Sequence, residues 1–151
     1  MIKEGQKAPN FNLPNQNGED ISLSDFLGKK VVLWFFPKAS TPGWTTEGQG
    51  FRDELEHFNN KDISIIGMSA DSVQKQKNFC DKQNFSYPIL ADETKETLKA
   101  YGAWGVKKMY GREYEGIIRC SFLINEEGRV EKVYDKVKTK SHAKDILSDI
   151  G

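Results

Sequence analysis

Two places in this sequence combine residue types and positions that suit chemistry with an anion. One is the start of a predicted helix, and the other is an arginine in an apolar strand. Val31–Phe36 is an apolar run of β-branched and aromatic residues, which predicts a strand buried on both faces. A helical pattern follows, for which Thr41 suits the N-cap and Pro42 the first helical position. The free N–H groups and positive dipole end of a first helical turn stabilise anions, such as a thiolate.

The arginine is Arg119, which lies inside the apolar segment GIIRCSFLI. A buried and unpaired charge is costly, so this residue needs a reason to be there. One reading is an arginine whose head reaches solvent from an edge strand. The other is a functional guanidinium, which lowers the pKa of a nearby thiol.

The remaining candidates are two cysteines and two histidines. Cys80 lies on a predicted amphipathic helix, and Cys120 is interpreted as a packing residue next to Arg119. His57 and His142 have no acidic or cysteine companions at metal-ligand spacing, so we interpret both as surface residues and predict no metal site.

Length and composition set the broad class. The chain has 151 residues, 37% of them hydrophobic and 29% charged, with 22 basic and 22 acidic side chains. A single domain over 1–151 is expected, and the balanced charge gives no indication of nucleic-acid or membrane binding. No apolar stretch is long enough to cross a bilayer, and Met1–Phe11 has no secretory h-region. Two cysteines are too few for a disulfide scaffold, which favours a reducing, cytoplasmic location.

The periodicity predicts a βα-type order of elements after a short N-terminal hairpin around Asn17-Gly18. The expected strands are 31–36, 63–69, 87–91, 117–125 and 129–134, and the expected helices follow Pro42 and cover 72–83, 95–101 and 141–150. Gly102–Gly116 is interpreted as a long aromatic-rich connection. This order predicts an α/β fold with a central mixed sheet and helices on both faces.

The segment FFPKASTPGWTTEGQGFRD resembles the active-site segment of peroxiredoxins, in the bacterioferritin-comigratory or peroxiredoxin Q branch. The likeness includes Thr41, Pro42 and Glu47, extends over essentially the whole chain, and implies a thioredoxin-like fold. It fails at the position of the peroxidatic cysteine, where this chain has Trp44. In many members a resolving cysteine follows five positions later, where this chain has Gln49.

The resemblance implies a peroxide site built from Thr41, Pro42, residue 44 and Arg119, with no cofactor. Cys80 lies 36 residues after Trp44 (80 − 44 = 36), and a subset of the branch carries its resolving cysteine on the corresponding helix. Cys80 is therefore a candidate resolving cysteine; the alternative is a small buried hydrophobe. The implied partners are a peroxide substrate and thioredoxin or a similar dithiol reductant, and the implied state is a monomer or weak dimer.

Three hypotheses fit a peroxiredoxin sequence without its nucleophile. The first is an engineered, inactive form of a thioredoxin-dependent peroxidase that reduces hydrogen peroxide and organic hydroperoxides. The second is a natural non-catalytic relative that serves as a binding or scaffold protein. The third is a redox protein that uses Cys80 alone for thiol exchange.

The volume of Trp44 leads to a structural expectation. An indole is much larger than a thiol, and overpacking a protein interior costs about 1–3 kcal/mol. We therefore expect residues 41–50 to be unwound or displaced, with the helix starting late and Trp44 outside the pocket. Gly43, Gly48 and Gly50 would make unwinding easier, because glycine lowers helix propensity.

Overall fold

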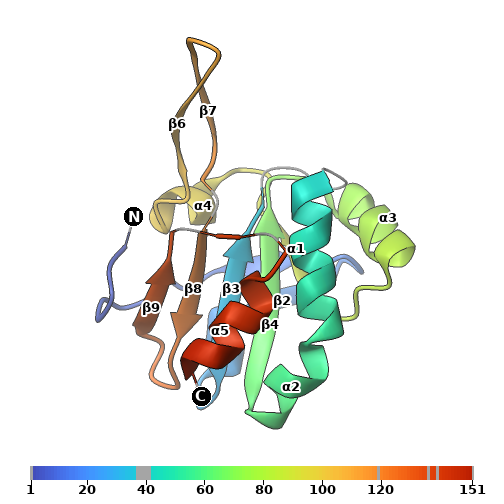
Figure 1. The fold of residues 1–151 in the computed structure, drawn as a ribbon, viewed down its shortest axis with the longest axis vertical. Coiled ribbons are helices and arrows are strands. Elements are labelled where there is room, and N and C mark those ends of the chain that lie inside the picture. The colour runs from blue at the N-terminus through green and yellow to red at the C-terminus, as the bar shows by residue number, and fades with distance from the viewer. Residues whose placement is uncertain (1, 37–41, 119, 136, 139, 151) are drawn as a thin grey trace.

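A five-stranded mixed sheet forms the centre of the molecule (Figure 1). The computed structural model describes residues 2–36, 42–118, 120–135, 137–138 and 140–150, except for the side chains of residues 42–44, 107–109 and 114. In spatial order the strands are β5 (Ile89–Ala91), β4 (Ile63–Ser69), β3 (Lys30–Phe35), β8 (Cys120–Ile124) and β9 (Val130–Tyr134). β3 pairs parallel with β4 and antiparallel with β8, so the strand predicted to be most buried is the central one.

The alternation of side chains along β3 divides the core into two parts. Val31, Leu33 and Phe35 pack into one cluster, and Val32 and Trp34 pack into the other. All five side chains are buried, which explains why the strand reads as an unbroken apolar run rather than an alternating one.

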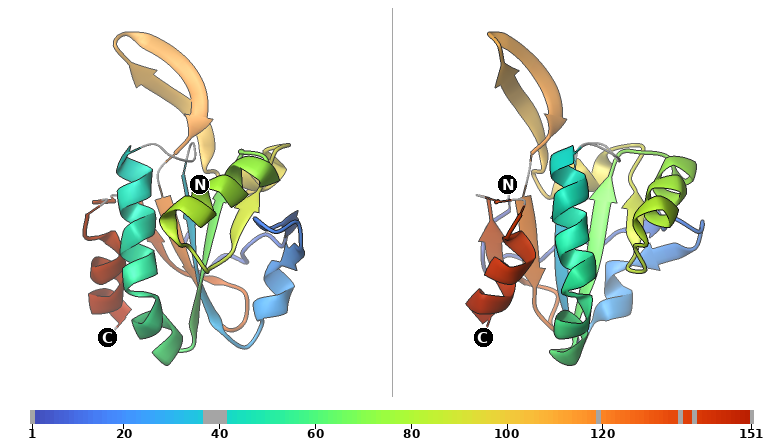
Figure 2. Two further views of the ribbon diagram at one scale, coloured as in Figure 1. Left: turned by 90° about the vertical axis from the view of Figure 1, so that its right-hand side faces the viewer. Right: turned by 45° about the vertical axis from the view of Figure 1, so that its right-hand side comes forward.

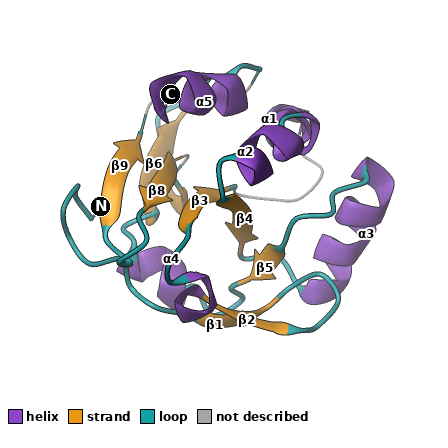
Figure 3. Cartoon of the chain, turned by 90° about the horizontal axis from the view of Figure 1, so that it is seen from below, coloured by secondary structure: helices purple, strands orange, loops and turns teal. Residues whose placement is uncertain are grey.

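Helices cover both faces of this sheet. The helices are α1 (Pro42–Asp53), α2 (Leu55–Asn60), α3 (Val73–Gln83), α4 (Glu96–Ala100) and α5 (His142–Ile150). Figure 3 shows α1, α2 and α5 on one side of the sheet, and α4 with the hairpin of β1 (Asn12–Pro14) and β2 (Asp20–Ser22) on the other. The predicted α/β, thioredoxin-like fold with an N-terminal hairpin is confirmed.

The start of α1 differs from the expectation based on the volume of Trp44. The helix begins at Pro42 and runs without interruption to Asp53, so the prediction of an unwound or displaced segment is wrong for residues 42–50. Pro42 occupies the first helical position, as its fixed φ and missing N–H favour. Thr41 and the side chain of Trp44 lie outside the described residues. The one irregularity comes later, at Glu54, which separates α1 from α2.

The segment predicted as a long connection is instead a β-hairpin. β6 (Trp104–Met109) pairs antiparallel with β7 (Arg112–Ile117), and the hairpin projects from the body of the molecule (Figures 1 and 2). Its turn consists of Tyr110 and Gly111, both with positive φ, at 53° and 75°. A two-residue turn of this kind matches the twist of the flanking strands, whereas the sequence lacks the usual Asn-Gly or Asp-Gly signal. No helix among the described residues is long and apolar enough to cross a membrane.

Candidate active site

The topology brings the ends of two strands to one edge of the sheet. β3 ends at Phe35, and the chain re-enters the described structure at Pro42, the start of α1. Phe35 is the register partner of Cys120, the first residue of β8, which follows Arg119 directly in sequence. Arg119 itself and Thr41 lie outside the described residues, as do the side chains of Pro42 and Trp44. The described residues next to Arg119 and to the segment of Thr41 in sequence, Cys120 and Phe35, are paired at one end of the sheet.

Cys80 is a free thiol on α3 that faces the core. It is 2% exposed and belongs to the same apolar cluster as Trp34 and Phe36. Burial, with a smaller contribution from the neighbouring Asp81 carboxylate, raises the pKa of the Cys80 thiol from its ordinary value of 9.0 to about 12. A thiol in this state is protonated near neutral pH and is a poor nucleophile. Any reaction of Cys80 therefore requires its helix to move.

Cys120 is also a buried thiol, at 1% exposed. It packs in the opposite cluster, with Phe35 and Phe122, across the sheet from Cys80. Its role as a packing residue is consistent with this placement.

One flank of α1 contacts α3 and the segment that follows it. Tyr87 donates a buried hydrogen bond of 3.0 Å to the carbonyl of Gly48, and Arg52 donates to the carbonyl of Gln83 at 2.8 Å. The side-chain amide of Gln49 donates to that of Gln83, also at 2.8 Å. Burial raises the pKa of Tyr87 well above its ordinary value, with smaller contributions from Cys80 and Glu47, so its hydroxyl stays protonated as a donor.

The other flank of α1 contains a buried polar group that sequence reasoning missed. His142 is 3% exposed, which corrects its interpretation as a surface residue; His57 is exposed as predicted. The Nε2 atom of His142 lies 2.8 Å from Oγ of Ser121 and 3.9 Å from Oε1 of Glu47, which is 1% exposed. An acidic companion therefore exists, although it lies 95 residues away in sequence (142 − 47 = 95).

A faint signal for this burial is present in the sequence. His142 precedes Ala143 and Ile146 on one face of an amphipathic helix, and all three are buried. Histidine is intermediate in its tendency to be buried, so its position on the apolar face did not by itself predict that His142 is buried. Among the described residues, no group of three or more acidic, histidine or cysteine side chains is arranged to hold a metal ion.

Comparison with known proteins identifies the family. The profile of the AhpC/TSA family matches residues 4–133. Peroxiredoxin Bcp of Bacillus subtilis is 44% identical over 149 residues, covering 99% of this chain and 95% of that protein. The Escherichia coli K12 peroxiredoxin Bcp is 38% identical over 147 residues, covering 97% and 94%. The chain belongs to the peroxiredoxins, in their Bcp and peroxiredoxin Q branch.

The structural comparison agrees with this family. The bacterioferritin comigratory protein of Xanthomonas campestris superposes with a TM-score of 0.91 at 34% identity, covering 98% of this chain and 97% of that chain. The family consists of thiol peroxidases, so the function predicted from the resemblance is confirmed at the level of the family. Two parts of the described structure are relevant to thiol peroxidase chemistry. One is the start of α1, where a helix stabilises a thiolate, and the other is the buried Cys80.

Proposed function

We propose that residue 44 occupies the position of the peroxidatic nucleophile and that the chain with Trp44 does not itself turn over peroxide. With a cysteine at position 44, the protein reduces hydrogen peroxide and organic hydroperoxides with thioredoxin or a similar dithiol. The observation that carries this proposal is the helix that begins at Pro42, because it places position 44 in its first turn, beside the free N–H groups and the positive end of the helix dipole. An indole has no ionisable thiol and cannot attack a peroxide.

In the proposed mechanism the thiolate at position 44 attacks one peroxide oxygen and the O–O bond breaks. The cysteine becomes a sulfenic acid, and the other oxygen leaves as water or an alcohol after taking up a proton. Thr41, Pro42 and Arg119 position the peroxide, and the guanidinium also stabilises the thiolate. The Cys80 thiol then condenses with the sulfenic acid, which releases water and forms a disulfide that a dithiol reduces.

The spacing of cysteines in a relative supports the role of Cys80. Two solved structures of Xanthomonas campestris peroxiredoxin Q are mutants in which one of two cysteines is replaced by serine, and those cysteines are 36 residues apart in that chain. Residues 44 and 80 have the same separation here (80 − 44 = 36). The remaining elements of the proposal are a cytoplasmic location and a monomer or weak dimer, as the branch resemblance implies.

The decisive experiment is peroxide consumption by the chain with Trp44 and by a Trp44→Cys variant, each with thioredoxin, thioredoxin reductase and NADPH. We expect the chain with Trp44 to react no faster than a buried thiol, and the variant to react faster by orders of magnitude. A Trp44→Ser variant is the matched control, because it removes the indole without supplying a thiol. If all three chains react equally slowly, the proposal is refuted and a non-catalytic binding or scaffold protein is favoured.

The codon for residue 44 and the intact mass of the native protein separate the possible origins of Trp44. A cysteine codon in the source gene means that tryptophan was introduced by engineering. A UGG codon means that it is natural. The codon UGA is read as stop, tryptophan or selenocysteine in different organisms, so a UGA codon with a mass matching selenocysteine would place a selenol nucleophile at this position.

A further inference from the structure

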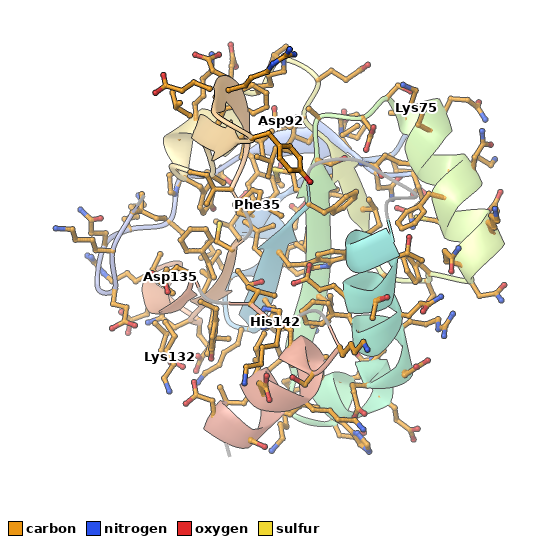
Figure 4. All side chains as sticks on the ribbon, turned by 45° about the horizontal axis from the view of Figure 1, so that its top comes forward. Phe35, Lys75, Asp92, Lys132, Asp135 and His142 are labelled. Atoms are coloured by element: carbon orange, nitrogen blue, oxygen red, sulfur yellow. The ribbon has the colours of Figure 1, made fainter. Side chains whose placement is uncertain are left out.

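His142 stands where three elements meet. It is the first residue of α5, and Figure 4 shows it on the side of that helix that faces α1 and the sheet. Its ring packs edge-on against Phe51 of α1 and against Tyr134 of β9, with centroid separations of 5.7 Å in both cases. The imidazole is therefore fixed in orientation by aromatic packing on two sides.

The polar edge of the ring joins α1 to β8. Nε2 is within hydrogen-bond distance of Ser121 on β8 and faces Glu47 on α1. When the proton is on Nε2, the ring donates to Ser121 and presents its positive N–H edge to the Glu47 carboxylate.

Three polar side chains near this pair direct their hydrogen bonds to other elements. The hydroxyl of Tyr134 donates to Asp149 at 2.7 Å, and the hydroxyl of Tyr87 donates to Gly48. Arg52 is directed to Gln83 and Asp53 on the far flank of α1. The side chain of His142, by contrast, reaches both α1 and β8.

The two elements that His142 joins are those that lead from the proposed site. Glu47 is three residues after position 44 on α1, and Ser121 is two residues after Arg119 on β8. A small displacement of reacting groups from their productive geometry can cost a large factor in rate. Relative movement of α1 and β8 would separate the nucleophile position from the guanidinium.

We propose that His142 is a positioning residue that clamps α1 to β8 through Glu47 and Ser121, and so fixes the nucleophile position relative to Arg119. The purpose that we assign to the clamp rests on the proposed function, but the contacts that form the clamp do not. The clamp itself is a property of the fold, because its three side chains are buried together in the chain with tryptophan at position 44.

The test in the Trp44→Cys background compares three substitutions. His142→Phe keeps a ring of similar size but removes both polar contacts, and His142→Gln keeps a polar group able to reach Ser121. Ile146→Ala is the matched control, since Ile146 is fully buried one turn further along α5 and makes only apolar contacts. The measurements are the second-order rate constant with hydrogen peroxide and the pH midpoint of alkylation of the thiol at position 44.

We expect His142→Phe to lower the rate constant at least tenfold and to move the alkylation midpoint to higher pH, because the thiolate loses its alignment with Arg119. His142→Gln should recover most of both effects. Ile146→Ala should destabilise the fold yet leave the midpoint unchanged. If His142→Phe and Ile146→Ala alter the midpoint and the rate constant alike, His142 is a packing residue and the inference is wrong.

A second measurement is independent of activity. In the chain with Trp44, hydrogen exchange of the α1 amides of residues 45–52 should accelerate at least tenfold in His142→Phe relative to Ile146→Ala, once both are compared at equal global stability. Inactivity of the Trp44→Cys parent would refute the proposed function while this exchange experiment still tests the clamp. Equal exchange in the two variants would refute the clamp even if the parent is an active peroxidase.

Discussion

The two flanks of α1 are held in different ways. On the α3 flank, two of the three hydrogen bonds end on Gln83, at the partly exposed end of a helix, and the third joins Tyr87 to Gly48. On the α5 flank, Glu47, Ser121 and His142 are all buried, at 1%, 0% and 3% exposed. Hydrogen bonds open to water contribute little net stability, whereas separating buried polar groups leaves them desolvated and unpaired.

This difference matters for Cys80, which lies on the α3 flank. The candidate resolving cysteine is attached to the side of α1 that can open at lower cost, while the clamp fixes the opposite side. The packing around two glycines of α1 differs in the opposite sense, because the apolar contact is tighter on the α3 flank. A Cβ at Gly48 would lie 2.7 Å from the Phe85 ring, whereas a Cβ at Gly50 would lie 3.7 Å from Cβ of Ala143.

The largest expected effect comes from Cys80→Ser in the Trp44→Cys background. Steady turnover with thioredoxin should fall by orders of magnitude, since no intramolecular disulfide forms, while the first reaction with peroxide proceeds at the parent rate. Stopped-flow measurement of the first turnover and mass spectrometry of non-reduced peptides separate the two steps. Cys120→Ser is the control and should keep both; a disulfide between positions 44 and 120 would reassign the resolving role.

The two glycines of α1 give a matched pair of stability predictions. Gly48→Ala should destabilise the protein by about 1–2 kcal/mol, because the overlap with the packed Phe85 ring exceeds the gain in helix propensity. Gly50→Ala should stabilise it by up to about 1 kcal/mol, since the new methyl group meets ordinary contact distances. Urea unfolding of both variants measures the difference. Similar effects of the two substitutions would show that the flanks are equally packed around these glycines.

Cys80 should make stability depend on alkaline pH. Its pKa is raised in the folded state from 9.0 to about 12, so its contribution is complete below pH 9 and is lost as pH rises towards 12. At pH 10 this loss amounts to about 1 kcal/mol, and a Cys80→Ala variant should lack it. Buried tyrosines such as Tyr87 lower stability in the same direction, so the difference between the two chains is the informative quantity. Parallel curves from pH 8 to 11 would contradict the prediction.

The smallest expected effect is that of Tyr87→Phe. It removes the hydrogen bond to the Gly48 carbonyl but keeps the ring stacked on Phe85, so the loss should be about 0.5–1.5 kcal/mol. Amide exchange should increase more in α3 than in α5 if the two flanks of α1 open independently. An equal increase in both helices would show that α1 moves as one unit and that its α3 and α5 flanks do not open separately.

Much of the fold follows from local patterns in the sequence. The apolar run at β3, the proline at the start of α1 and the periodicity of α3 and α5 placed these elements within a residue or two of their observed bounds. The hairpin of β6 and β7 was missed because its strands carry mixed polar residues and its turn is Tyr110-Gly111. The volume argument for Trp44 was wrong about the backbone of α1, because the preference of Pro42 for the first helical position was obeyed.

The sequence by itself determined the family, and it predicted position 44 as the nucleophile position and Cys80 as the candidate resolving cysteine, because these inferences depend on residue types at fixed separations along the chain. Only the tertiary structure decided that Cys80 is buried with a raised pKa, and that His142 lies against Glu47 and Ser121. Periodicity reports which face of a helix is apolar, but it does not say which distant side chain that face meets. The packing of α1, α5 and β8 brings Glu47, His142 and Ser121 together. Because all three side chains are buried, His142 links α1 to β8.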